Sequence, residues 1–191
     1  MTTTPSPLTV VIPAKNESRL LPNLLESLCR QDYPLMPSTK VYVADAGSTD
    51  GTQQLALSFT GRLDIEVIPG GLPSVGRNAG ARRAQTPYVL FIDADMELKN
   101  PTLIRRTMRL ASRRRLHCVT TNIWCSNGRL RDQALYLLND LAQYGSLLVR
   151  PFSTGMFMLF EKRAFDRLGG FHEGAPTTFS IASRSPASGP M

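Results

Sequence analysis

The sequence predicts one α/β domain in which helices cover both faces of a mostly parallel sheet, the doubly wound arrangement. Its 191 residues suit a single domain with a sizeable core, and 42% of them are hydrophobic. Short apolar runs, rich in β-branched residues, are typical of strands and recur four times in the first half of the chain. Segments with helical spacing separate these runs, and strands joined by helices form parallel sheets.

The first half of the chain supplies most of the expected elements. Leucines recur at helical spacing after the first apolar run, and the third strand alternates polar and apolar residues as a half-buried strand does. Ser74 is expected to cap a helix that runs to Ala84, and Pro87 ends that helix before the fourth strand. In chain order we expect a strand at 8–12, a helix at 17–30, a strand at 40–44, a helix at 49–58, a strand at 64–68, a helix at 74–84 and a strand at 88–92.

The second half of the chain is less regular. Leucines at helical spacing predict an amphipathic helix at 132–148, packed on the sheet. Met156, Phe157, Met158 and Phe160 are expected to be core residues of a strand, and His117 a satisfied core or edge residue. Residues 1–7 and the Ser/Pro/Ala/Gly-rich residues 174–191 are predicted to be disordered tails, because such segments bury too little apolar area.

Cysteine content and hydropathy exclude several classes of protein. Cys29, Cys118 and Cys125 form an odd set without C-x-x-C spacing, and only two histidines are present, so a structural zinc site is not expected. No apolar run approaches the roughly 20 residues that span a bilayer. Residues 1–7 lack the basic and apolar regions of a signal peptide. We therefore expect a cytoplasmic protein with reduced cysteines.

The formal charge of +7 is unevenly distributed, because six arginines are concentrated in one expected helix. A cluster of arginines can bind the phosphates of nucleic acids or anionic lipids, but a solvated helix face is more frequent. No aromatic residue interleaves the arginines, so no nucleic-acid partner is expected, whereas peripheral contact with the inner face of a membrane remains an alternative. One expected helix carries Arg105, Arg106, Arg109, Arg113, Arg114 and Arg115.

Acidic residues follow three of the expected strands, at the points where the strands end. They lie in residues 13–17, in residues 45–51 and at Asp93 and Asp95. Open α/β sheets bind ligands beyond the carboxyl ends of their strands. Positions i and i+2 of a strand project together, so Asp93-Ala94-Asp95 could hold one hard cation. An isolated D-x-D is more often a solvated turn, but acids at three strand ends favour a ligand site.

Four segments resemble, in order and spacing, those of glycosyltransferase family 2: VIPAKNE at 11–17, VADAGSTDGT at 43–52, GRNAGA at 76–81 and FIDAD at 91–95. Residues 153–160 and 163–171 resemble the acceptor side of that family, so the resemblance covers 8–173. It implies the GT-A fold, which is Rossmann-like, with a nucleotide-binding half at 8–95 and an acceptor-side half at 96–173. It also implies transfer of a sugar, with inversion, from a nucleotide-sugar to a saccharide or lipid-linked acceptor.

The same resemblance implies a role for individual residues. Two residues also have a structural interpretation: Glu17 suits the N-terminal end of a helix, where an acid complements the helix dipole, and Arg77 suits an exposed helix surface. Gly70 and Gly71 are interpreted as a flexible turn. By resemblance, Asp45 hydrogen-bonds the base, typically uracil, and the base and ribose are enclosed by Pro13, Ala14 and Glu17. Arg77 and Asn78 lie beside the diphosphate, and the ribose and phosphates are contacted by Asp93, Ala94 and Asp95. The resemblance also implies that Asp95, with Asp93, coordinates Mn²⁺ or Mg²⁺, and that Gly155 lies on the acceptor side.

The sequence departs from the family after Glu173. Members continue into an acidic pair that is identified with the general base, whereas residues 174–191 contain no acid, as in a truncated or divergent chain. Glu173 is the only nearby carboxylate, and the family places its base farther along, so the catalytic base is unassigned. Two alternatives stay open: a non-catalytic nucleotide-sugar-binding protein, and a basic nucleic-acid-binding module.

Overall fold

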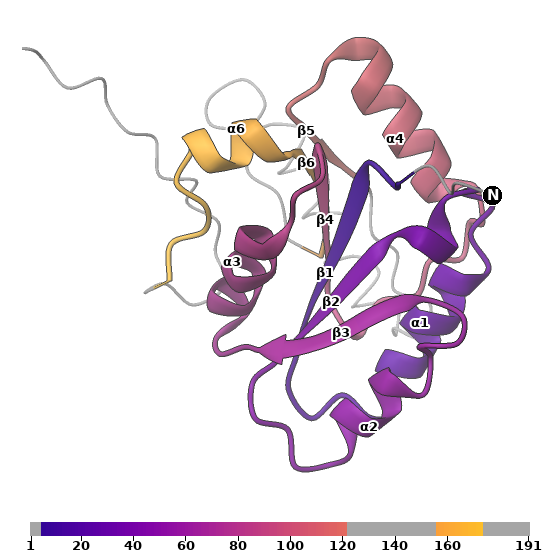
Figure 1. Cartoon of the computed structure of the whole chain (residues 1–191), viewed down its shortest axis with the longest axis vertical. Helices are drawn as coiled ribbons and strands as arrows, with labels where there is room; N and C mark the ends of the chain where they lie inside the picture. The colour runs from indigo at the N-terminus through magenta and orange to yellow at the C-terminus, as the bar shows by residue number, and fades with distance from the viewer. Residues whose placement is uncertain (1–4, 122–155, 174–191) are drawn as a thin grey trace, which may run out of the picture.

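The computed structural model describes residues 5–121 and 156–173. Within these ranges six strands form one sheet in the order β3-β2-β1-β4-β6-β5 (Figure 1). Strands β1 to β4 are parallel, β6 is antiparallel to β4, and β5 is antiparallel to β6. The predicted mostly parallel sheet is therefore confirmed. The strands are β1 (Leu8–Ala14), β2 (Lys40–Asp45), β3 (Asp64–Pro69), β4 (Tyr88–Ile92), β5 (Cys118–Thr120) and β6 (Phe157–Glu161).

Helices cover both faces of the sheet, as predicted. In Figure 1, α1, α2 and α4 lie on one side of the strands, and α3 and α6 lie on the other. None of the described helices is long and apolar enough to cross a membrane. The helices are α1 (Leu21–Cys29), α2 (Thr52–Leu57), α3 (Pro73–Arg83), α4 (Leu103–Arg114) and α6 (Lys162–Arg167), with a 3-10 turn at Met36–Ser38.

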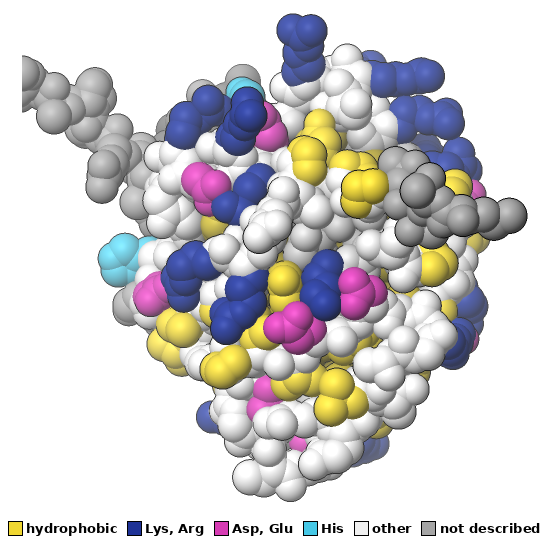
Figure 2. Space-filling model, viewed as in Figure 1, with side chains coloured by type: hydrophobic (Ala, Val, Ile, Leu, Met, Phe, Trp, Pro, Cys, Tyr) yellow, Lys and Arg dark blue, Asp and Glu magenta, His cyan; other side chains and the backbone are white. Residues whose placement is uncertain are grey.

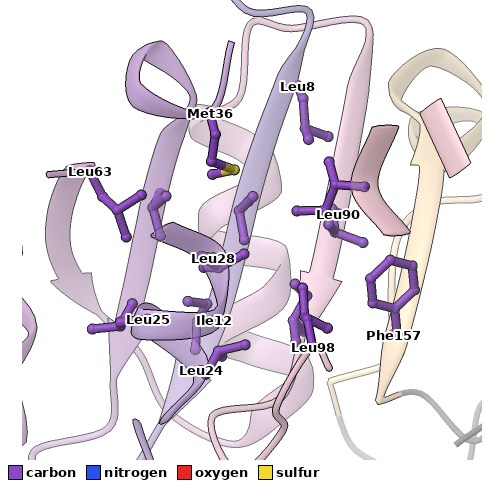
Figure 3. Packing of buried hydrophobic residues seen from close by; sticks show 14 of the residues in the cluster. Leu8, Ile12, Leu24, Leu25, Leu28, Met36, Leu63, Leu90, Leu98 and Phe157 are labelled. Atoms are coloured by element: carbon purple, nitrogen blue, oxygen red, sulfur yellow. The ribbon is translucent and has the colours of Figure 1, made fainter. Parts of the chain in front are cut away.

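The larger core cluster lies between the sheet and α1, α2 and α4. Figure 3 shows Leu24, Leu25 and Leu28 of α1 directed at Ile12 of β1 and its neighbours. These leucines are completely buried, as their spacing predicts, whereas Leu20 precedes the helix and is 45% exposed. The helix is shorter than predicted because residues 17–20 form a turn in which the Glu17 carbonyl accepts from the amides of residues 20 and 21.

The smaller cluster lies on the α3 and α6 face and is rich in phenylalanine. The Phe91 ring lies 5.0 Å from that of Phe171 and 5.1 Å from that of Phe165, measured between centroids. Phe160 joins them from β6, 5.5 Å from Phe165. The expectation that Phe157, Met158 and Phe160 are core residues of a strand is confirmed, although Phe157 belongs to the larger cluster. For Met156 the expectation is wrong, because Met156 precedes β6 in a bend and is only half-buried.

Two local expectations need correction, and the expectation for His117 is confirmed. Ser74 does not cap α3: Leu72 holds the N-cap position, and Pro73 begins the helix, where a missing N–H costs nothing. Residues 5–7 are not part of a disordered tail, because Ser6 is buried and its hydroxyl lies 2.8 Å from that of Thr39. His117 is an edge residue beside β5, exposed, with Nδ1 2.6 Å from a carboxylate oxygen of Glu161.

Other expectations fall outside the described residues. They concern Gly155, the helix at 132–148, and the tails at 1–4 and 174–191.

Candidate functional site

The carboxyl ends of β1 and β2 are joined into one surface by their loops. The two strands end side by side, with Ala14 paired to Asp45, and the Ala46 amide donates to the Ala14 carbonyl at 2.9 Å. Both following loops are polar, so their side chains can serve as partners for the backbone of the other loop. Four bonds result: Asn16 N to Ser48 Oγ (2.8 Å), Glu17 N to Thr52 Oγ1 (2.9 Å), Ser18 N to Asp50 Oδ2 (3.0 Å) and Thr49 N to Asn16 Oδ1 (3.0 Å).

Asp45 is the last residue of β2, and one of its two carboxylate oxygens accepts hydrogen bonds from the chain while the other accepts none from the described residues. Its Oδ2 accepts from Gly47 N (3.0 Å), Ser48 N (2.9 Å) and Gln53 Nε2 (2.7 Å). Burial would raise the pKa of Asp45, but the hydrogen bonds from Ser48, Gln53 and Gly47 outweigh it and hold that pKa below its ordinary value. Its Oδ1 is buried and has no hydrogen-bond partner among the described residues. A buried, charged oxygen without a hydrogen bond lowers the stability of the fold, and a hydrogen-bond donor of a ligand would satisfy it.

Asp93, directly after β4, is paired with Arg77 of α3. Their side chains are 26% and 6% exposed, and the guanidinium also lies over the Phe171 ring, 5.7 Å from its centroid. Burial raises the pKa of Asp93, Arg77 opposes that rise, and Asp95 adds to it. Ala94 is buried in the larger cluster, which leaves Asp95 exposed two residues beyond Asp93. In the D-x-D segment, the Asp93 carboxylate is therefore bound by Arg77, and the Asp95 side chain is exposed to solvent.

Glu17, in the loop after β1, is influenced by the charges of the other carboxylates. Burial raises the pKa of Glu17, and the charges of Asp95, Asp50 and Asp93 raise it further. In the described part of the chain, no group of three or more His, Cys, Asp or Glu side chains could hold a metal by itself. Mg²⁺ and similar cations are usually held by one or two carboxylates and by phosphate oxygens of the substrate. Asp93 and Asp95 fit that donor set, and the repulsion at Glu17 is what a cation would relieve.

Asn78, next to Arg77, faces the segment after α6. Its Nδ2 donates to the Phe171 carbonyl (2.8 Å) and to Glu173 Oε1 (2.9 Å), and its Oδ1 accepts from the Phe171 amide (2.9 Å). Hydrogen bonds from Asn78 and Arg82 hold the pKa of Glu173 below its ordinary value, although burial opposes them. Asn78 and Glu173 border a hollow of about 460 Å³ that Asp45, Asp93 and Asp95 do not line.

The structure thus brings most predicted site residues to one edge of the sheet and sets two apart. Pro13, Ala14, Glu17, Asp45, Asp93 and Asp95 lie at the carboxyl ends of β1, β2 and β4, and Arg77 joins them through Asp93. Asn78 and Glu173 lie together beside Phe171 and border the separate hollow.

Sequence reasoning missed the roles of two residues that build this edge, Asp50 and Gly70. Asp50 binds the Thr52 hydroxyl at 2.5 Å and thereby holds the loop after β2, a role that its Asp-x-Thr spacing could have indicated. At Gly70 the sequence predicts only a flexible turn. A Cβ there would lie 2.5 Å from the Ala44 carbonyl oxygen, so Gly70 is required for close approach to β2. No sequence signal distinguishes these two uses of glycine.

This arrangement agrees with the comparison against known families. The model of glycosyl transferase family 2 matches residues 9–169. The chain belongs to glycosyltransferase family 2. The predicted resemblance is therefore confirmed, and with it the expectation that the chain is a glycosyltransferase by descent.

Relatives and solved structures of this family extend beyond the chain. It is 33% identical over 98 residues to poly(ribitol-phosphate) beta-N-acetylglucosaminyltransferase TarS of Staphylococcus aureus, covering 49% of this chain and 17% of that protein. It is 35% identical over 105 residues to validoxylamine A glucosyltransferase of Streptomyces hygroscopicus, covering 53% and 24%. The chain thus spans about a quarter or less of these two relatives.

The solved structures confirm the GT-A fold. S. aureus TarS 1-349 superposes with a TM-score of 0.70 at 22% identity, over 88% of this chain and 51% of that one. The mannosyltransferase PcManGT of Pyrobaculum calidifontis, in complex with GDP-Man and Mn²⁺, gives a TM-score of 0.68 at 23% identity, over 92% and 50%. TarS 1-349 has also been solved with UDP-GlcNAc. The chain spans about half of each of these structures.

Proposed function

We propose that this chain binds a nucleotide-diphosphate-sugar, with uridine as the nucleoside, at the carboxyl ends of β1, β2 and β4. The sugar is transferred with inversion to a hydroxyl group of a saccharide or lipid-linked acceptor, with the help of Mn²⁺ or Mg²⁺. Solved relatives in complex with UDP-GlcNAc, and with GDP-Man and Mn²⁺, support a donor and a divalent cation of this kind.

The open oxygen of Asp45 is the observation that carries the proposal. It is buried, charged and without a partner among the described residues, at the strand end where ligands of α/β sheets bind. The ring N–H of uracil is a donor that would satisfy it. Pro13 and Ala14 at the end of β1, with Glu17 in the following loop, would wall the base and ribose.

Asp95 and Asp93 would hold the cation with the diphosphate of the donor. When bound, the cation supplies Lewis-acid stabilisation of the charge that develops on the leaving diphosphate. Arg77 orients the Asp93 carboxylate through their ion pair, and this places its guanidinium beside the proposed diphosphate site. We keep Asn78 as a donor-side candidate, although its amide group binds Phe171 and Glu173 in this structure.

A second candidate function is binding of the donor without transfer. Inverting transfer needs a base that removes the proton of the acceptor hydroxyl. Glu173 is the carboxylate nearest to the position of that base in the sequence, but its oxygen accepts from Asn78 and Arg82, and its pKa is lowered. Both features weaken Glu173 as a base, so binding and turnover need separate tests.

Calorimetric titration with UDP and with GDP, each with and without Mn²⁺, tests the donor site. We expect UDP to bind in the presence of Mn²⁺, and the affinity to fall at least tenfold in Asp95→Asn and in Asp45→Asn. Asp64→Asn is the matched control, because Asp64 is exposed at the start of β3, away from the carboxyl ends of the strands, and pairs with Lys40 of β2. Absence of UDP binding, or equal loss in the control, would refute the proposed site. Release of UDP from a UDP-sugar then separates transferase from binding protein.

A further inference from the structure

A band of arginines covers the outer face of α4. The helix buries Ile104, Thr107, Met108 and Ala111 against the rest of the domain. At 3.6 residues per turn, three arginines lie within about 60° of one another around the axis, directly opposite the buried residues. Two more follow at the C-terminal end of the helix. The α4 arginine band consists of Arg106, Arg109, Arg113, Arg114 and Arg115, all exposed.

Within the described residues, no carboxylate forms an ion pair with the arginines of the band. Residues 98–121 contain no Asp or Glu. Arg105 of the same helix is paired with Asp32, with Nε 3.0 Å and Nη2 2.8 Å from carboxylate oxygens. The band is therefore a concentrated positive surface.

The band lies at the end of the sheet opposite the acidic edge. The helix begins beside the end of α1, where the Ile104 amide donates to Gln31 Oε1 at 3.1 Å. It ends beside the start of β5, where the His117 carbonyl accepts from the Glu161 amide. Parallel strands begin at this end of the sheet, and Figure 2 shows Lys and Arg side chains along the side where Figure 1 places α4. A negatively charged plane would attract this end and repel the acidic edge.

We propose that the α4 arginine band is a docking surface for the anionic phospholipid headgroups of a membrane. An exposed basic helix can lie along a plane of phosphates, and each basic residue near such a surface adds to the attraction. Leu110, which is 38% exposed, lies one turn from both Arg106 and Arg114 and adds an apolar side chain to the same surface. The polarity of the domain then leaves the edge with Asp45 and Asp95 facing water.

A lipid surface fits the band better than a nucleic acid does. Binding of single strands relies on aromatic side chains on which bases stack. The sequence of α4 has no aromatic residue, and the large hydrophobic side chains exposed in the described part of the chain are leucines, at positions 20, 57, 72 and 110. The band thus offers charge and an aliphatic group, which suit headgroups and the acyl boundary.

Cosedimentation of the full chain with vesicles tests the proposal. Vesicles of phosphatidylcholine alone should not bind, and vesicles that also contain phosphatidylserine should. Each arginine contributes about fivefold at such a surface, so R106Q/R109Q/R113Q should bind about 100-fold more weakly. The charge-conserving R106K/R109K/R113K should bind like the parent chain. The matched control is R83Q/R163Q/R167Q, which removes the same charge from α3 and α6 on the other face of the sheet.

The outcomes distinguish a lipid-binding surface from attraction by net charge and from a nucleic-acid site. Equal loss in the control variant would mean that binding follows net charge alone, and would overturn the assignment to α4. Tighter binding of the chain to an RNA oligonucleotide than to the acidic vesicles, abolished by the same triple variant, would assign the band to nucleic acid instead. Leu110→Ser should weaken vesicle binding and leave RNA binding unchanged, and no effect on vesicles would overturn the headgroup geometry. Donor binding by R106Q/R109Q/R113Q should be unaltered.

Discussion

Replacing Arg77 by Gln should destabilise the folded chain by about 3–4 kcal/mol at neutral pH. The substitution leaves the Asp93 carboxylate without its countercharge, and only 26% of that side chain reaches solvent. Breaking a buried pair costs about 3–5 kcal/mol, and partial exposure places this one at the lower end. Loss of the contact between the guanidinium and the Phe171 ring, 5.7 Å from its centroid, adds about 0.5–1 kcal/mol.

Urea unfolding followed by circular dichroism measures this loss. With a slope of about 2 kcal/mol per molar, the midpoint should fall by about 1.5–2 M. The deficit should also depend on pH. Burial raises the pKa of Asp93 above its ordinary value even beside Arg77, and the substitution raises it further. A raised folded pKa costs stability above the unfolded value of about 3.9. The deficit of the variant should therefore shrink as the pH falls through the raised pKa of Asp93.

Arg77→Gln with Asp93→Asn is the matched control for the charge. The double variant removes both charges and retains two side chains that can hydrogen-bond, so it should recover most of the loss at neutral pH. A deficit of the same size in the single and double variants, or one that does not change between pH 7 and pH 4, would refute the reasoning that an uncompensated Asp93 is its cause.

Three further predictions concern the packing of α3 on β1 and the carboxylates at the ends of the strands. Gly80→Ala should cost about 1–3 kcal/mol of stability in urea unfolding, because the added Cβ would lie 2.4 Å from Val11 Cγ1. Asp45→Asn should cost about 2 kcal/mol at neutral pH. The pKa of Asp45 is lowered in the folded chain, so its contribution should be lost, and the gap should close, as the pH falls below about 4. Asp95→Asn should lower the pKa of Glu17, measured by ¹³C NMR titration, because Asp95 is the carboxylate that raises it most.

Controls distinguish these effects from general damage. Gly61→Ala should be nearly neutral, since a Cβ there meets nothing within 4 Å, and an equal loss would contradict the packing argument for Gly80. A gap between parent and Asp45→Asn that does not narrow as the pH falls from 7 to 3 would mean that ionisation is not its source. Asp64→Asn should leave the pKa of Glu17 unchanged, and a Glu17 that does not respond to Asp95→Asn would place the two carboxylates farther apart than we infer.

The sequence predicted the parallel part of the sheet well because each strand carries its own local signal. Apolar β-branched runs identified β1 to β4 to within two residues at either end, and D-x-D fell directly after β4. Helix ends were less predictable. The periodic leucines of α1 continue back to Leu20, but a turn with bonds to the Glu17 carbonyl delays the start of the helix. Ser74 has the ordinary chemistry of a cap, and Pro73 before it took the first position.

The site was predictable as a set of acids but not as a network. Asp45, Asp93 and Asp95 were identified because they end strands. The partners of Arg77 and Asn78 were not, because they come from distant parts of the chain: Asn78 and Phe171 are 93 positions apart. No local pattern in the sequence states which of two adjacent polar residues faces which neighbour. Only the packing of α3 between β1 and the segment after α6 decides that.

Helix α3 links the end of β4 to the segment after α6 through these neighbouring residues. Adjacent positions on a helix point about 100° apart. Arg77 therefore reaches Asp93 at the end of β4, while Asn78 reaches the backbone of Phe171 after α6. Gly80 lets the same helix approach β1 closely enough for both contacts. A displacement of α3 would therefore alter the Asp93 carboxylate and the Phe171 segment together.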